Sequence, residues 1–203
     1  MSRLTVGSIE GLTENSNVIS VPTGHKLNVT DAGGLQIGGS AVVSAGLVLV
    51  SRTTIGSAVS TVTVSNAFSA DYDNYIVVLS GGAHSSGAAL WARLGGFTTG
   101  YYYGGIEYNY SGTSSANSGA NVGFFKIGNA DPNGNFGYAI IQNPYSTKLT
   151  AFTTSWAGSV TSGSSKQTLG FLNNTSSITS IEVFPNTGTF NGGYVDVYGY
   201  VKA

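Results

Sequence analysis

Cysteine is absent from this 203-residue chain, and the absence excludes disulfide bonds, thiolate zinc sites and thiol catalysis. Charged residues make up only 8% of the chain, and its eight basic and nine acidic residues form no Lys/Arg cluster. Without a basic patch to neutralise phosphates, nucleic-acid binding is not expected. The longest apolar run, residues 41–50, is far shorter than the roughly 20 residues of a membrane-spanning helix, so membrane insertion is not expected either.

Residues that commonly carry catalysis are few, and the sequence shows no known catalytic combination of them. His25 and His84 are the only histidines, and both lie in turn-like sequence, where a Ser-His-Asp triad is not expected. No G-x-S-x-G motif occurs. A glycoside hydrolase needs two carboxylates that flank the bound sugar. Nothing in the sequence pairs any two of the carboxylates in the larger, C-terminal part of the chain. These carboxylates are Asp71, Asp73, Glu107, Asp131, Glu182 and Asp196. We expect no enzyme activity, and polysaccharide depolymerisation stays open as the catalytic alternative.

The stretch "DPNGN" at 131–135 begins like a calcium-binding loop. Such a loop needs Gly at its sixth position and Glu at its twelfth, whereas this chain has Phe136 and Gln142 there. A tight hairpin turn around Asn133-Gly134 explains the stretch better. No metal ion and no cofactor are expected.

Alternating and short apolar blocks dominate the chain, and no glycine-free window shows the 3.6-residue period of a helix. The sequence therefore predicts an all-β fold. Beyond about residue 55 the spacing of the strands is that of a sandwich or barrel. The expected strands lie near 58–65, 74–80, 88–95, 100–110, 122–128, 136–143, 147–156, 167–173, 178–184 and 193–202.

Period-two alternation indicates which side chains are buried in several of these strands. Leu90, Ala92 and Leu94 share one face, and Trp91 and Arg93 share the other. Val195 and Val197 likewise alternate with tyrosines near the C-terminus. Residues 75–79 are apolar on both faces, which predicts a central strand.

A repeat of eight residues distinguishes the N-terminal segment. The triplets Ile-Ser-Val, Leu-Asn-Val, Leu-Gln-Ile and Val-Ser-Ala begin at residues 19, 27, 35 and 43. So few rungs cannot bury a core alone, and such repeats become stable only when neighbours cover them. We expect three copies of the chain to interleave here, with a solvated linker as the alternative. The trimer core would consist of Ile19, Val21, Leu27, Val29, Leu35, Ile37 and Val43.

The chain accordingly divides into an N-terminal attachment and stem segment, 1–52, and a β-sandwich domain, 53–203. Aromatic residues are the best candidates for a binding surface in the sandwich, because Tyr and Trp combine apolar rings with a hydrogen-bonding group. The expected stacking platform for sugar rings consists of Trp91, Arg93, Tyr101, Tyr102, Tyr103, Tyr108 and Tyr110, with hydrogen bonds from Asn109, Asn117 and Asn121. The alternative is that this face packs against another subunit or the second sheet.

Several stretches resemble the fibre proteins of tailed bacteriophages. "ADYDNYIVVLSGG", "GAALWARLGG", "YYYGGIEY" and the ending "ITSIEVFPNTGTFNGGYVDVYGYV" are similar to the C-terminal domains of such fibres. "GLTENSNVISVPTGHKLNVTDAGGLQIGG" resembles their repetitive stems. The resemblance spans most of the chain, but the chain lacks the long shaft of many tail fibres.

This resemblance implies a homotrimeric virion appendage. Its N-terminal segment would dock on other virion proteins, and its jelly-roll-like sandwich would contact a glycan or protein on the host surface. The shortness of the chain also admits a head fibre, a capsid-decorating protein or an adaptor with a structural role alone.

Overall fold

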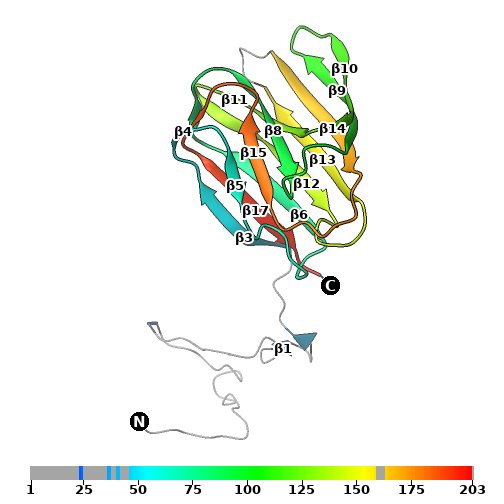
Figure 1. Ribbon diagram of the computed structural model, residues 1–203. Coiled ribbons are helices and arrows are strands. Elements are labelled where there is room, and N and C mark those ends of the chain that lie inside the picture. The colour runs from blue at the N-terminus through cyan, green and yellow to red at the C-terminus, as the bar shows by residue number, and fades with distance from the viewer. Residues whose placement is uncertain (1–22, 25–35, 38–39, 42–45, 159–162, 203) are drawn as a thin grey trace, which may run out of the picture. The chain divides into compact units, whose positions relative to one another are not determined.

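The computed structural model describes residues 23–24, 36–37, 40–41, 46–158 and 163–202 (Figure 1). The chain divides into two compact units, 1–43 and 44–203. In the first unit, β1 (Gln36–Ile37) pairs with β2 (Ser40–Ala41) as antiparallel strands. Of the expected stem core, Ile37 lies in β1. The other members lie outside the described residues, so the trimeric stem stays a prediction: Ile19, Val21, Leu27, Val29, Leu35 and Val43.

The second unit is a β-sandwich made of antiparallel strands, which confirms the predicted all-β class. Its long sheet consists, in spatial order, of β10 (Ser114–Val122), β9 (Tyr101–Asn109), β14 (Ser164–Leu172), β13 (Thr150–Ala157), β12 (Gly134–Gln142), β6 (Asn74–Ser80), β17 (Tyr194–Tyr200) and β3 (Leu47–Thr54). The short sheet consists of β11 (Phe125–Asp131), β8 (Ala88–Leu94), β15 (Ile181–Pro185) and β5 (Val62–Val64). A third, small sheet joins β4 (Ser57–Val59), β16 (Phe190–Asn191) and β7 (Ala83–His84).

Strand β12 links the two large sheets. Its first residues pair with β11, and its later residues pair with β13 and β6. Two glycines allow β11 and β12 to approach where β12 changes partners. A Cβ atom on Gly128 would overlap the carbonyl oxygen of Phe136, and one on Gly137 would overlap that of Ile127. Any larger residue at either position would separate the two strands.

Eight of the strands alternate between the sheets along the chain, except that β8 and β11, which follow each other among these eight, both lie in the short sheet. They lie in the order β3-β17-β6-β12 in the long sheet and β5-β15-β8-β11 in the short sheet. This order favours the jelly-roll connectivity, which is built from two Greek keys, and that connectivity stays an interpretation. The hairpins β9–β10 and β13–β14 extend the long sheet beyond β12.

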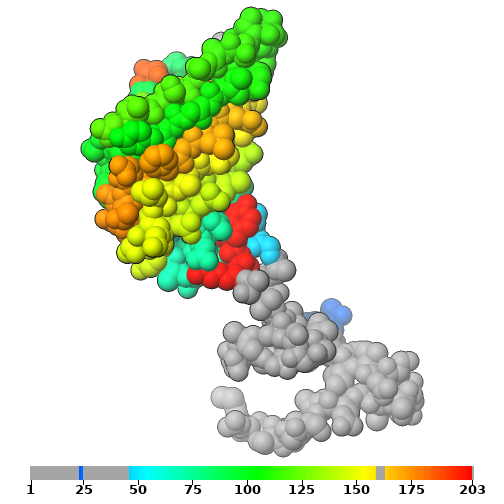
Figure 2. Space-filling view, turned by 90° about the vertical axis from the view of Figure 1, so that its right-hand side faces the viewer, coloured from blue at the N-terminus to red at the C-terminus, as the bar shows by residue number. Residues whose placement is uncertain are grey.

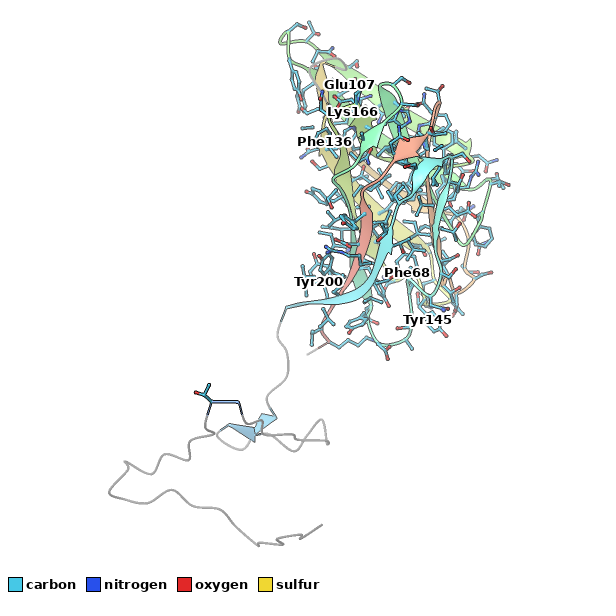
Figure 3. All side chains as sticks on the ribbon, turned by 90° about the vertical axis from the view of Figure 1, so that its left-hand side faces the viewer. Phe68, Glu107, Phe136, Tyr145, Lys166 and Tyr200 are labelled. Carbon is cyan, nitrogen blue, oxygen red and sulfur yellow. The ribbon has the colours of Figure 1, made fainter. Side chains whose placement is uncertain are left out.

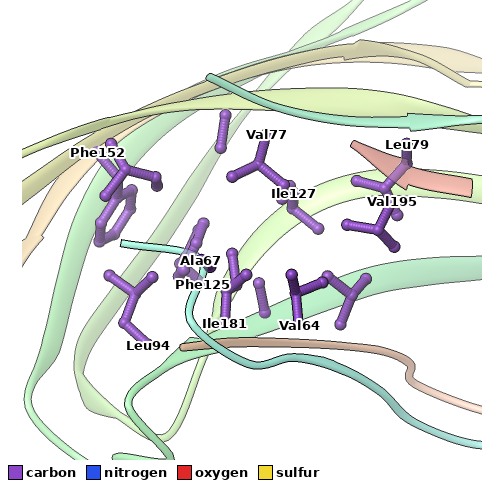
Figure 4. Close-up of a cluster of buried hydrophobic side chains, with 14 of the residues drawn as sticks. Val64, Ala67, Val77, Leu79, Leu94, Phe125, Ile127, Phe152, Ile181 and Val195 are labelled. Atoms are coloured by element: carbon purple, nitrogen blue, oxygen red, sulfur yellow. The ribbon is translucent and has the colours of Figure 1, made fainter. Parts of the chain in front are cut away.

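The core lies between the two sheets (Figure 4). Leu90, Ala92 and Leu94 are fully buried, as their alternation predicts. Across the core, the ring of Phe125 from the short sheet stacks on that of Phe152 from the long sheet, with 4.3 Å between centroids. The predicted central strand is β6, which pairs with β12 on one side and β17 on the other.

Two strands differ from the sequence-based expectation. Residues 47–52, which were assigned to the stem, form most of β3 and pair with β17, so the boundary between the units lies near Ser44. The boundary was placed too far along the chain because the apolar alternation of β3 follows the apolar repeat without a break in the sequence. Strand β10 was missed because its sequence, SSANSGANV, has almost no apolar pattern. Among the described residues, no helix is long and apolar enough to cross a membrane.

A matched pair of leucines tests the position of the core. Leu172 is fully buried at the end of β14, whereas Leu149, just before the neighbouring β13, is 46% exposed. We expect Leu172→Ala to lower the free energy of unfolding by about 2–5 kcal/mol, because it leaves a cavity. Leu149→Ala should change it by less than about 0.5 kcal/mol. Urea unfolding measures both, and equal costs would contradict the assigned core.

Candidate functional site

The outward side of the long sheet forms one continuous surface, here called the outer face (Figure 2). Paired residues on neighbouring strands share a face, so the strand registers define its rows. One row crosses all eight strands as Ser118, Gly104, Leu169, Thr153, Ile140, Ile76, Tyr198 and Leu49. The next row consists of Ala116, Ile106, Gln167, Ser155, Tyr138, Val78, Asp196 and Arg52.

Apolar side chains on the outer face are unusually exposed. Leu169 is 61% exposed, and Leu47 and Leu49 are each 48% exposed. Phe136, Tyr138, Phe171, Tyr194 and Tyr200 are also exposed. Strands spaced about 4.8 Å apart give the eight-stranded face a width of about 38 Å, and five residues at about 3.3 Å each give it a length of about 17 Å or more. The whole face therefore covers roughly 600–800 Å². Its exposed apolar side chains share this area with polar ones such as Thr153, Ser155 and Gln167.

The two rows contain one pair of charges, and these charges neutralise each other. The guanidinium of Arg52 donates two hydrogen bonds of 2.8 Å to the carboxylate of Asp196, which is 3% exposed. The hydrogen bonds and the charge of Asp196 raise the pKa of Arg52 further above its ordinary value. Arg52 also lies 4.9 Å from the ring centroid of Tyr194. No net charge therefore results from these two rows, which suits burial against another protein.

A hollow of about 560 Å³ opens beside β12. Its lining is mainly apolar and aromatic and includes Ile76, Val78, Phe136, Tyr138 and Trp156. The side-chain oxygen of Asn135, which also lines the hollow, is buried without a hydrogen-bond donor in the described part of the chain. The hollow can accept an apolar side chain or a ring with a hydrogen-bond donor.

A ridge stands on the same face, on β14 and β9. It consists of Leu169, Phe171 and Tyr102, and the rings of the last two stack with 5.4 Å between centroids. Leu169 pairs with Gly104 on one side and Thr153 on the other. Because both neighbours are small, the leucine side chain projects above them.

A smaller pocket of about 160 Å³, here called the tyrosine pocket, lies near Tyr108. Its lining consists of Tyr108, Ser155, Trp156, Ser165, Lys166 and Gln167. The strand registers place Tyr108, Ser155, Ser165 and Gln167 on the outer face, and Trp156 and Lys166 on the opposite face of the sheet. Tyr108 is 50% exposed, and Lys166 is held by an ion pair of 2.9 Å with Glu107. Aromatic rings beside hydroxyl and amide groups are the chemistry that recognises a sugar.

The ion pair of Lys166 belongs to a polar cluster beside this pocket. Ser164 donates to Glu107 at 2.7 Å, and Lys126 donates to Asn117 at 2.6 Å. Burial raises the pKa of Glu107, but the hydrogen bonds from Ser164 and Lys166 outweigh burial, so its pKa lies below the ordinary value. Burial and the charge of Lys166 lower the pKa of Lys126. Figure 3 places Glu107 and Lys166 at the end of the sandwich opposite Tyr200 and Tyr145.

The expected sugar platform is divided by strand alternation. Tyr101 and Tyr103 point into the core and are buried, so the expectation that they form an exposed surface is wrong. Tyr102, between them, lies on the outer face. Tyr108 and Tyr110 are exposed near the end of β9. A run of adjacent tyrosines in a strand cannot present all its rings to one side.

The expected asparagine donors are also engaged within the chain. Asn109 donates to Thr113, Asn117 bonds with Thr168 and Lys126, and the side-chain oxygen of Asn121 accepts hydrogen bonds from Thr99 and Gly100. They hold the β9–β10 hairpin and the sheet beside it.

Trp91 and Arg93 lie together, on the short sheet. The Trp91 ring stacks on Phe124 with 3.8 Å between centroids and meets the edge of Phe184. Arg93 lies 4.4 Å from the centroid of Phe184 and donates to the carbonyl of Gly123 at 2.9 Å. One face of the tryptophan is therefore already covered. The residues that sequence reasoning missed are Phe124 and Phe184, and the alternation around Phe184 was the available signal.

No family model and no curated protein matches the chain. Among the described residues, no group of three or more His, Asp or Glu side chains could hold a metal ion. The two surfaces that stand out are thus the outer face, suited to another protein surface, and the tyrosine pocket, suited to a sugar.

The polar cluster predicts a defined pH dependence. A carboxylate whose pKa is lowered by folding stabilises the fold above its ordinary pKa, and this contribution is lost as pH falls through the lowered value. We expect Glu107→Gln to reduce the loss of stability between about pH 5 and pH 3 by roughly 0.5–1 kcal/mol, because water partly screens the pair. Urea unfolding at several pH values measures it. Glu182→Gln is the control, since Glu182 forms no ion pair in the described part of the chain. An unchanged pH profile in Glu107→Gln would contradict the prediction.

Proposed function

We propose that this protein is a short homotrimeric fibre of a tailed phage that attaches the particle to a glycan on the host surface. The observation that carries the proposal is the outer face of the long sheet, which exposes apolar side chains and whose two rows carry no net charge. Such a face suits assembly rather than a solitary chain. The resemblance of the strand sequences to phage fibre domains and the period-eight repeat support the same function.

The layout of the sandwich fits a fibre tip. The chain enters β3 beside the end of β17, where Val201 donates to the carbonyl of Gly46 at 3.0 Å. The polar cluster, next to the tyrosine pocket, lies at the opposite end (Figure 3). A glycan site at that end would be presented away from the point where the N-terminal segment leaves the sandwich. Three copies would raise avidity by orders of magnitude even if each site were weak.

The molar mass of the full chain in solution tests the assembly. Light scattering after gel filtration should give about three times the chain mass of 20.8 kDa. A monomer at all concentrations would contradict the homotrimer, and with it the stem and the assembly role of the outer face.

Retention on host polysaccharide tests attachment. We expect Tyr108→Ala to weaken retention at least about tenfold, because one lost ring contact is multiplied over several sites. Tyr145→Ala is the matched control, since Tyr145 is also exposed but lies at the opposite end of the sandwich (Figure 3). No retention of the unmodified protein on host cells or polysaccharide would contradict the attachment function.

A capsid-decorating or adaptor protein is the second candidate. It is favoured by Tyr102, whose ring stacks on Phe171 in an outer face that suits another protein surface. The stacking of Trp91 on Phe124 of the same chain points the same way, because it leaves less of the tryptophan ring for a sugar. Particles carrying Tyr108→Ala distinguish the two. Full adsorption together with intact assembly would support the decorating role.

A further inference from the structure

We propose that the outer face is a head-to-tail interface between copies of this chain, in which the ridge of Leu169, Phe171 and Tyr102 on one copy enters the hollow beside β12 on the next. This inference deepens the proposed function and rests on its homotrimer. It assigns the contact to particular strands of the sandwich.

The ridge cannot fill the hollow of its own chain. Leu169 lies on β14, and Ile76, in the wall of the hollow, lies in the same row on β6. Three strand spacings of about 4.8 Å separate them by about 14 Å, and side chains stand perpendicular to the sheet. An exposed leucine and an apolar hollow on one rigid surface are therefore both left without a partner.

The chemistry of the face favours a second copy as the occupant. The two rows that cross the sheet carry no net charge, because Arg52 and Asp196 neutralise each other. A nucleic acid or an acidic peptide would need free cations, which these rows do not offer. The same two rows of another copy carry no net charge, and its face supplies an apolar ridge that matches the hollow in character. The whole face covers roughly 600–800 Å². In a head-to-tail ring each copy divides this area between two neighbours, and the two contacts together approach the roughly 800 Å² that one partner contributes to a standard interface.

The ridge and the hollow lie at different places on the outer face, and this limits how copies of the chain can assemble. Ridge and hollow are different surfaces. In a two-fold pair each ridge would enter the other copy's hollow, whereas in a heterologous, head-to-tail contact the ridge and the hollow of one copy meet two different neighbours. The head-to-tail arrangement is the one that agrees with a trimer. A heterologous contact leaves one ridge and one hollow free on every open chain of copies, and it is satisfied only when the ring closes. Three copies close such a ring with a rotation of about 120° between neighbours, in agreement with the trimer proposed for the stem.

Because the chain has no cysteine, crosslinking can test the contact in the complete protein. Leu169→Cys marks the ridge, and Ala157→Cys marks the exposed rim of the hollow. Both native side chains are exposed, so neither change is expected to prevent folding. A short bismaleimide should convert the double variant to covalent dimers and trimers on a denaturing gel. Each single variant should stay at one chain, since a ridge meets only a hollow.

The control pair replaces the ridge cysteine by Leu149→Cys, which marks an exposed leucine outside the two rows and the ridge. It should yield no covalent trimer. A protein that is trimeric by light scattering but gives no crosslinked trimer in the double variant would overturn the ridge-and-hollow contact and leave the proposed function intact. Covalent dimers from Leu169→Cys alone would overturn the head-to-tail arrangement. A monomeric protein would instead contradict the proposed function itself.

Discussion

The side chain of each residue in a β-strand points to the opposite side from that of its neighbour, so a sheet has two faces. The side chains on each face must pack against other protein or contact water. In this sandwich the short sheet covers one face of the long sheet and leaves the other open. Val77 and Val197 are fully buried on the covered face, whereas Leu49 and Leu169 are exposed on the open one. Since exposed apolar side chains lie at several places across the open face, this face suits contact with another protein surface.

The two hairpins that extend the long sheet change the chemistry of its covered face. Near β12 that face carries Ala139 and Ile141, but on β9 and β14 it carries Glu107 and Lys166. A larger apolar core at this end would need a wider short sheet. The ion pair of Glu107 and Lys166 and the amide of Asn117 instead satisfy one another. The tyrosine pocket lies beside this polar end, where hydroxyl groups of a ligand would meet compatible partners.

Alternation explains how much the sequence could predict. It correctly assigned the buried residues of β8. The central position of β6 was predicted from the opposite signal, because its residues are apolar on both faces. The expected sugar platform was wrong at Tyr101 and Tyr103, because adjacent tyrosines of one strand point to opposite faces and cannot form one surface. Strand β10 carries no apolar signal and depends on its pairing with β9. The hollow was beyond prediction, because it is lined by three strands whose register only the folded sheet defines.

The ion pair of Arg52 and Asp196 lies on the open face and joins the edge strand β3 to its neighbour β17. Strand β3 pairs with β17 in the long sheet, and the two hydrogen bonds from Arg52 to Asp196 add side-chain contacts to this pairing. A buried charge is costly unless it is paired, so Asp196 favours a docked β3 over a detached one. The strand that leads from the N-terminal repeat is therefore held at the side of the outer face. Any force transmitted through that segment would reach the sandwich at β3, beside the surface that we assign to neighbouring copies. Assembly through the outer face would then shield the same ion pair from water and strengthen the attachment of β3.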